Sequence, residues 1–360
     1  WVNHETADPQ FVSQFEYWRK DLKKTKAQVD KEMKAVGGSI LHLRQQDGVW
    51  SVIKDSKLNR RLDAFTNIPF AGGYKIRGKS SAQGTLANCA GGMTPWKTFL
   101  SCEENYHHYY GEVSFDQSGK CSVKAAKPEM GFDIYYQNPP EHYGWVVEIE
   151  PLTGKAQKLV QLGRFSHEGA TCRLAADNRC VVYMGDDADD QFFYKFIAAK
   201  PGSLVDGELY VANIEKGEWL SLNWEKNPQL KTAFPSQLDV LIRAREAAKL
   251  LGATPLDRPE DCEVDPVTGA VILACTNNKS KGRPFGSLLR LMEKDKDPLS
   301  LTFTAQTWLM GGEQTGFACP DNLLFDRLGN LWMTTDISDD NLNKAPYTAF
   351  GNNSLFYIPL

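Results

Sequence analysis

At residues 147–154 the chain reads VEIEPLTG, which is a strand-forming run followed by an acidic residue and a turn that contains glycine. The same order recurs at residues 262–269, CEVDPVTG, and at residues 323–330, LLFDRLGN. Hydrophobic runs joined by short glycine turns are typical of β-hairpins. The pattern therefore predicts repeated antiparallel hairpins and an all-β fold.

The spacing of the three acidic turn residues favours a β-propeller. Glu150 and Asp265 are 115 residues apart, and Asp265 and Asp326 are 61 residues apart. These gaps fit two units and one unit of a period of about sixty, and propeller blades of about 40 to 50 residues are lengthened by insertions. We expect a single β-propeller domain over residues 1–360, six-bladed when complete; a pair of β-sandwiches explains the repeated turns less well. Asp265 and Asp326 themselves are assigned to turns.

Two segments read as helices inserted among the strands, at about residues 9–36 and 236–251. The first carries an apolar stripe with steps of three and four residues, which starts after Asp8-Pro9 and stops at Gly37-Gly38. The second ends at Gly252. Strands are expected at residues 144–151, 180–184, 192–197, 270–275, 288–292, 301–308 and 330–335.

The whole-chain numbers exclude some classes of protein. The 360 residues carry 41 basic and 45 acidic side chains, a net charge of -4, which favours neither nucleic acid nor an anionic membrane as a partner. No apolar run reaches the length of a membrane span. The eight cysteines include no CxxC pair, which argues against a zinc ribbon. Both Trp1 and Leu360 lie in strand-like sequence, so we expect the first and last blades to be incomplete.

The richest chemistry lies in residues 88–105, which read NCAGGMTPWKTFLSCEEN. This stretch combines two thiols, Cys89 and Cys102, with the adjacent carboxylates of Glu103 and Glu104. Thiolate suits iron or zinc, whereas carboxylate and amide oxygens suit calcium or magnesium. The segment therefore indicates a mixed-metal centre.

Further acidic clusters lie next to the expected strands. In a propeller, loops of this kind converge on one end of the central channel, which would gather distant side chains into one site. Taken singly, each has a plainer interpretation: Cys89 as a small buried hydrophobe, His167 as a structural histidine and Arg258 as part of a salt bridge. The clusters are His167-Glu168, Asp186-Asp187, Arg258-Pro259-Glu260-Asp261, Cys319-Pro320-Asp321-Asn322 and Asp336.

Together these stretches resemble one family, the PhoX-type alkaline phosphatases. The chain departs from the family pattern at Lys97, where glycine is usual, at Asp189-Asp190 and at Cys262-Glu263. The matching segments follow the same order along nearly the whole chain: Asn3-His4-Glu5, 84–96, 100–105, 143–149, 163–169, 183–187, 258–260, 276–278 and 320–336.

The resemblance implies a β-propeller with helical additions, whose site holds iron (Fe³⁺) and calcium with an oxygen that bridges metals. It also implies hydrolysis of phosphate monoesters outside the cytoplasm, so the enzyme would be periplasmic or secreted. Carried over by motif, Cys89 would ligate iron and Arg258 would hold the substrate phosphate. The other ligands would be Glu168, Glu260 and Asp321 in the iron and calcium cluster, and Glu103, Glu104 and Glu5 on the calcium side.

The implied mechanism needs no serine or cysteine nucleophile. Cations would offset the charge of the phosphate and a metal-bound oxygen would attack phosphorus, with Arg258 and Glu168 as the catalytic residues. The expected partner is a small phosphate monoester, with no nucleic acid and no membrane insertion, and the expected state is a monomer. Two alternatives stay open: a calcium-dependent propeller hydrolase of another substrate, such as a lactonase, and a non-catalytic propeller that binds partners and keeps metals as staples.

Overall fold

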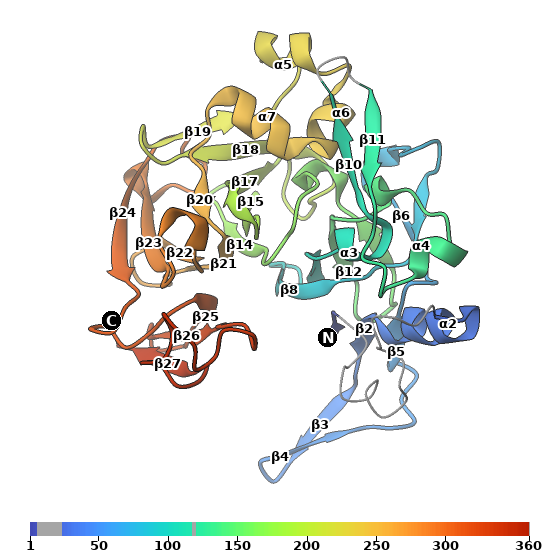
Figure 1. Cartoon of the computed structure of the whole chain (residues 1–360), viewed down its shortest axis with the longest axis horizontal. Coiled ribbons are helices and arrows are strands. Elements are labelled where there is room, and N and C mark those ends of the chain that lie inside the picture. Colours follow the sequence, from blue (N-terminus) through green and yellow to red (C-terminus); the bar gives the residue numbers. More distant parts are fainter. Residues whose placement is uncertain (6–23, 117–119, 360) are drawn as a thin grey trace. The chain divides into compact units, whose positions relative to one another are not determined.

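The computed structural model describes residues 1–5, 24–116 and 120–359, which divide into two compact units (Figure 1). The first unit comprises residues 1–91 and 97–160, and the second comprises residues 92–96 and 161–360. Short strands in antiparallel pairs dominate both units, and the helices are few and short. The all-β expectation is therefore confirmed. None of the sheets in the described part closes on itself, so a ring of blades stays a prediction.

The first unit is built from small sheets with the strand orders β1-β2-β5, β3-β4, β6-β7, β10-β11 and β13-β12-β9-β8. Its strands are β1 (Val2–His4), β2 (Gly37–Ile40), β3 (Leu43–Gln46), β4 (Val49–Val52), β5 (Arg60–Leu62), β6 (Asn67–Pro69), β7 (Ser81–Gln83), β8 (Asn88–Met93), β9 (Phe99–Glu103), β10 (Glu112–Phe115), β11 (Cys121–Lys124), β12 (Val146–Ile149) and β13 (Ala156–Lys158). The short helices are α2 (Lys26–Ala35), η1 (Ala71–Gly73), α3 (His107–Tyr110), α4 (Phe132–Tyr135) and η2 (Pro140–His142); η3 (Val160–Leu162) spans the last residue of this unit and the next two residues of the chain.

The second unit has larger sheets, with the orders β14-β15-β17-β18-β19, β16-β20, β21-β22-β23-β24 and β25-β26-β27. Its strands are β14 (Thr171–Leu174), β15 (Cys180–Gly185), β16 (Asp189–Gln191), β17 (Phe193–Ala198), β18 (Gly207–Asn213), β19 (Glu218–Ser221), β20 (Leu256–Asp257), β21 (Pro259–Val264), β22 (Val271–Cys275), β23 (Ser287–Glu293), β24 (Phe303–Met310), β25 (Pro320–Phe325), β26 (Leu331–Thr335) and β27 (Leu355–Ile358). Its helices are α5 (Pro228–Ala233), α6 (Gln237–Ile242), α7 (Ala244–Leu251), η4 (Lys279–Lys281) and η5 (Lys294–Lys296).

The three large sheets of the second unit pack one against the next. Side chains of β15, β17, β18 and β19, including Tyr183 and Trp219, share one buried cluster with Leu273 of β22. The neighbouring residue, Ile272, points to the opposite face and packs with Leu323 of β25 in a second cluster. Because successive side chains of a strand alternate between faces, β22 is buried on both sides. Each fully buried aliphatic side chain contributes about 1.5–3 kcal/mol, so this sheet ties the unit together.

The predicted hairpin turns form as expected, and their acidic residues explain why. Asp265 accepts hydrogen bonds from the backbone N–H groups of Val267 and Thr268. Glu150 accepts in the same way from the backbone N–H groups of Leu152 and Thr153, and Asp326 accepts from those of Leu328 and Asn330. A carboxylate that binds the backbone of its own turn favours the reversal of the chain. The assignment of Asp265 and Asp326 to turns is confirmed.

The predicted helices are only partly confirmed. α2 begins with a capping box between Thr25 and Gln28 and ends before Gly37, whose φ of 96° suits glycine. The part of this prediction over residues 9–23 lies outside the described residues. The helix predicted over residues 236–251 is two helices, α6 and α7, because the chain leaves helical geometry at Arg243, with φ -110° and ψ 40°. Gly252 ends α7 in the left-handed conformation, as expected.

Candidate metal centre

The first unit brings two of the predicted ligands together. Cys89 lies in β8, and Glu104 follows the last residue of the neighbouring strand β9. A ligand atom of Cys89 and one of Glu104 lie within 4.8 Å of each other. The backbone N–H of Glu104 donates to the carbonyl oxygen of Ala87 at 2.9 Å, which fixes this end of β9 beside the start of β8.

Glu103 is held differently, because protein donors surround its carboxylate. Its Oε1 accepts from Lys158 Nζ at 2.7 Å and from the Thr85 hydroxyl at 2.8 Å. Its Oε2 accepts from the backbone N–H groups of Gly144 and Trp145. The side chains of Glu103 and Lys158 are both fully buried, and the pair joins β9 to β13. The role of Glu103 on the calcium side stays a prediction, and so does that of Glu5, whose carbonyl oxygen accepts from the Tyr109 hydroxyl.

The second unit brings three predicted ligands together. One carboxylate oxygen each of Glu168, Glu260 and Asp321 lies within 4.8 Å of the others. Glu260 lies in β21 and Asp321 in β25, while Glu168 lies in the loop before β14. Glu168 and Glu260 are buried and Asp321 is half-buried. Three acidic side chains from distant parts of the sequence thus converge within the second unit.

The same local backbone geometry precedes two of these carboxylates. Arg258 and Cys319 precede β21 and β25, and each has a positive φ, 52° and 54° respectively. A proline follows in each case, and then the acidic residue, Glu260 or Asp321. The pairing of both strands shifts register there, between Pro259 and Cys262 and between Pro320 and Leu323. A β-bulge re-aims side chains, which explains how each strand turns its acidic residue toward the cluster.

Burial, and after it the neighbouring negative charges, raises the pKa values of the carboxyl groups in the cluster. Burial, together with the charges of Asp187 and Glu168, raises the pKa of Glu260 well above its usual value, and Arg258 opposes this effect. Burial, with Asp336 as the next cause, raises the pKa of Asp321 to about 7. Burial also raises the pKa of Asp336 itself. A bound cation would relieve this crowding, because it neutralises several carboxylates at once.

The donor set fits a metal ion. Within the described ranges, Asp321 Oδ1 is buried and has no hydrogen-bond partner. Buried acceptors are normally satisfied, so an orphaned carboxylate oxygen beside two other carboxylates indicates a cation site. Carboxylate oxygens suit calcium and, with a thiolate, iron.

Arg258 is the cation placed beside the three carboxylates. Its Nε and Nη2 donate to the two oxygens of Asp187, each at 2.8 Å, and Nη2 lies 3.1 Å from Oε1 of Glu260. The side chain remains 31% exposed, so a ligand can reach it. Asp187 is therefore the hydrogen-bond partner of this guanidinium.

Two other candidates have structural roles in the fold. Asp186 accepts from Arg245 of α7 and from the backbone N–H of Ser166. His167 stacks on Phe165, its Nε2 lies 2.9 Å from the carbonyl oxygen of Gly163, and burial lowers its pKa to about 3. The plainer interpretation of His167 is the one that the geometry supports.

Sequence reasoning missed the contacts that Thr276 makes. The Thr276 hydroxyl oxygen lies 2.5 Å from Oε1 of Glu260 and 2.9 Å from the carbonyl oxygen of Pro320, next to Asp321. A hydroxyl has one hydrogen and can donate to only one of these acceptors. The motif Thr276-Asn277-Asn278 carried no signal of this role.

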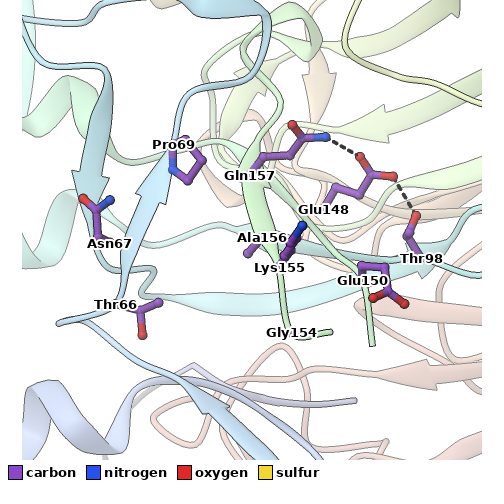
Figure 2. A pocket seen from close by; sticks show the side chains of 10 residues that line it. All are labelled: Thr66, Asn67, Pro69, Thr98, Glu148, Glu150, Gly154, Lys155, Ala156 and Gln157. Atoms are coloured by element: carbon purple, nitrogen blue, oxygen red, sulfur yellow. Dashed lines mark hydrogen bonds between the residues drawn. The ribbon is translucent and has the colours of Figure 1, made fainter. Parts of the chain in front are cut away.

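A pocket of about 570 Å³ lies elsewhere in the first unit, against β6, β12 and β13 (Figure 2). On its wall, Glu148 accepts hydrogen bonds from Thr98 and Gln157. None of the predicted site residues lines it. Its lining residues are Thr66, Asn67, Pro69, Thr98, Glu148, Glu150, Gly154, Lys155, Ala156 and Gln157.

In the described part of the chain, no helix is long and apolar enough to cross a membrane.

Comparison with known proteins agrees with the motif resemblance. A family model described as Alkaline phosphatase PhoX matches residues 1–357. The chain is also similar to the solved structure of Pseudomonas fluorescens PhoX in complex with vanadate, a transition-state analogue, with 28% sequence identity and a TM-score of 0.89. That similarity covers 99% of this chain and 74% of the other. No curated protein sequence matches the chain.

Proposed function

Because the chain belongs to the PhoX family of alkaline phosphatases, we propose that it hydrolyses phosphate monoesters at a metal centre held in part by Glu168, Glu260 and Asp321. Family membership makes the chain a phosphoric monoester hydrolase. The observation that carries the proposal about the centre is the convergence of these three carboxylates within 4.8 Å, with a guanidinium beside them. Family membership also favours this function over a lactonase or a non-catalytic propeller.

We propose iron (Fe³⁺) and calcium as the metals. Hard carboxylate oxygens suit both ions, and the thiolate of Cys89 suits iron. The proposed ligands in the first unit are Cys89 and Glu104, with Glu103 and Glu5 on the calcium side. When bound, such metals supply positive charge and activate water for attack on phosphorus.

The protein's own groups then bind and orient the substrate. Arg258 carries five N–H donors: its Nε and Nη2 groups bind Asp187, so a phosphate oxygen would be bound through Nη1, and the single ammonium of a lysine could not serve both partners in this way. Asp187 and Glu260 hold the guanidinium in place. Glu168 is buried beside Glu260 and Asp321 and supplies the third carboxylate of the group that would bind a cation. This arrangement supports the assignment of Arg258 and Glu168 as catalytic residues.

The finer expectations on fold and location are also proposals. The three packed sheets of the second unit follow one another in chain order, which is the arrangement expected of successive propeller blades. We therefore propose a single six-bladed β-propeller domain with helical insertions. We further propose a periplasmic or secreted, monomeric enzyme that acts on small phosphate monoesters.

Metal analysis combined with a phosphatase assay tests the proposed function. The purified protein should contain iron and calcium and should hydrolyse a chromogenic phosphate ester, and a chelator should abolish the turnover. Glu260→Gln should lower kcat/KM by roughly 100-fold or more, because it removes a metal-facing charge. Glu246→Gln is the matched control, because Glu246 pairs with Arg243 on the surface of α7.

Two outcomes would contradict the proposal. Full turnover by protein that contains no metal would exclude a metal-dependent mechanism. Calcium alone, with turnover of lactones instead of phosphate esters, would favour the lactonase alternative. For Cys89, the test is Cys89→Ala, which should lose iron; retained iron would count against its role as an iron ligand.

A further inference from the structure

Asp261, which the function proposed above does not use, lies at the centre of the three converging segments. It follows Glu260 in β21 and sits inside the bulge between Pro259 and Cys262. The side chain is buried, at 7% exposed. Its Oδ1 accepts the backbone N–H of Cys262 at 2.8 Å, and its Oδ2 accepts the backbone N–H of Leu323 at 3.1 Å.

This one carboxylate touches the backbone that carries each candidate ligand. Asp261 is the neighbour of Glu260 in sequence. Leu323 lies two residues after Asp321, so the bond from its N–H ties β25 to β21. Gly169 follows Glu168, and a Cβ placed on Gly169 would come less than 3.0 Å from Oδ1 of Asp261. The segment of Glu168 is therefore packed directly against the same side chain.

The arrangement around Asp261 differs from that of an ordinary buried turn residue. Asp265, four residues further along, also accepts two backbone N–H groups, at 2.8 and 3.1 Å. Both of its donors, Val267 and Thr268, belong to its own turn. The donors and close neighbours of Asp261 belong to three segments that are distant in sequence. Of these two aspartates, only Asp261 can therefore set the spacing between segments.

We propose that Asp261 is a positioning residue that holds Glu168, Glu260 and Asp321 at the separation that a shared metal ion requires, an inference that rests on the function proposed above. A buried group behind the ligands fixes their orientation, and removing such a partner typically costs 10- to 100-fold in metal affinity or activity. Asp261 itself makes no contact with metal or substrate in this role.

Calcium binding to metal-free protein tests the inference. The chelated protein is titrated with Ca²⁺ alone by calorimetry, and the iron and calcium contents of untreated protein are measured in parallel. Asp261→Asn should weaken Ca²⁺ binding about tenfold or more, because the amide accepts only one of the two N–H groups and turns its NH₂ toward the other. Asp265→Asn is the matched control: it changes a carboxylate that also accepts two backbone N–H groups, and it should leave Ca²⁺ affinity unchanged.

Gly169→Ala tests the same contact from the opposite side, and it replaces Asp261→Asn in the Ca²⁺ titration if that variant fails to fold. The added methyl group meets Oδ1 of Asp261 first and Cγ at 3.3 Å, whereas the Cα of Asp261 is at an ordinary 3.7 Å. Gly169→Ala should therefore weaken Ca²⁺ binding in the native background and have no further effect in the Asp261→Ala background.

The outcomes separate this inference from the proposed function. If the native protein binds neither Ca²⁺ nor iron, the proposed metal centre is wrong and the inference falls with it. If the native protein binds metal and the Asp261→Asn and Gly169→Ala variants bind it equally well, the metal centre stands and the inference is overturned. Equal loss of affinity in Asp265→Asn would also overturn it, because the effect would then be one of stability alone.

Discussion

Arg258 combines an unfavourable backbone conformation with a demanding side-chain position. A φ of 52° costs a non-glycine residue roughly 1–2 kcal/mol. The conformation is held because the carbonyl oxygen of Arg258 accepts the N–H of Thr276, and because the guanidinium binds Asp187 with two parallel bonds. Strain of this kind persists where the surroundings fix it, and it gathers at functional sites.

Arg258→Lys should therefore separate activity from folding. Lysine keeps the charge and the Cβ but cannot bind Asp187 with two parallel bonds and also present a further N–H group to a phosphate. We expect kcat/KM for a chromogenic phosphate ester to fall roughly 100-fold, with a small change in unfolding temperature. Arg179→Lys alters an exposed arginine–aspartate pair, with Asp177, and Arg179 is 32% exposed; it should leave both quantities near native values. Native activity in Arg258→Lys would show that catalysis does not need the guanidinium group.

At the scale of single residues, sequence motifs identify the candidate ligands better than the residues that position those ligands. Glu168, Glu260 and Asp321 are expected together, and they are together. Asp261 and Thr276 stand in segments that the motifs mark, but the sequence assigns them no role, because their contacts depend on β-bulges and on strands distant in sequence. The sequence marks Asp187 only as part of an acidic pair, because no local pattern shows that Arg258 reaches it across 71 residues. Local patterns reveal residue types, whereas these contacts follow from the register of strands.

At the scale of elements, a buried ion pair joins the sheet β14-β15-β17-β18-β19 to the sheet β21-β22-β23-β24. Lys195 of β17 and Glu293 of β23 lie 2.8 Å apart, and both side chains are fully buried. Glu293 also accepts from the Tyr183 hydroxyl at 3.0 Å and from Trp219 Nε1 at 3.2 Å. These three partners all belong to the other sheet. A buried charge is costly unless it is paired and fully hydrogen-bonded, and this network meets both conditions.

Breaking the pair should therefore cost more than removing it entirely. Glu293→Gln and Lys195→Met should each lower the free energy of unfolding by about 3–5 kcal/mol, because each leaves one buried charge without its partner. The double variant should lose less than either single variant, since glutamine still accepts from Tyr183 and Trp219 and no charge remains. Urea unfolding of the four proteins measures this coupling. Additive losses would show that the two side chains act independently.

The elements themselves are predicted well where a strong local signal exists. The strands expected at residues 180–184, 270–275 and 330–335 match β15, β22 and β26 closely, because apolar β-branched runs bounded by turn residues specify them. The interruption between α6 and α7 at Arg243 is not predicted, since neither glycine nor proline marks it. The sheet order of the second unit also lies beyond sequence patterns, because it depends on packing between hairpins.

At the scale of the whole molecule, a net charge of -4 hides an uneven placement of acidic groups. The second unit buries several carboxyl groups, and burial is the largest cause of the raised pKa values of Asp261, Glu263 and Asp321, each to about 7. A carboxyl group whose pKa is raised on folding favours the folded state below its unfolded pKa. That contribution is lost as the pH rises through the folded value. An alkaline phosphatase would work at pH values where these buried carboxyl groups are ionised and no longer stabilise the fold.

Glu263 offers a test of this cost that touches no proposed metal ligand. Its pKa rises from 4.5 to about 7, so its ionisation destabilises the fold progressively between about pH 4.5 and pH 7. Glu263→Gln should match the native protein at pH 4 and should be more stable at pH 8, on the order of 1 kcal/mol once its partial exposure is allowed for. The measurement is the unfolding temperature of metal-free protein at both pH values.

Asp265→Asn supplies a control of opposite sign on the same hairpin. Burial alone would raise the pKa of Asp265, but hydrogen bonds from Thr268 and Val267 outweigh it and lower that pKa. Its ionised form therefore stabilises the fold above its unfolded pKa, and this variant should be less stable than the native protein at pH 8. If Glu263→Gln instead destabilised the protein at pH 8, the ionised Glu263 would have to be stabilised by its surroundings, and burial would not be the dominant influence on its charge.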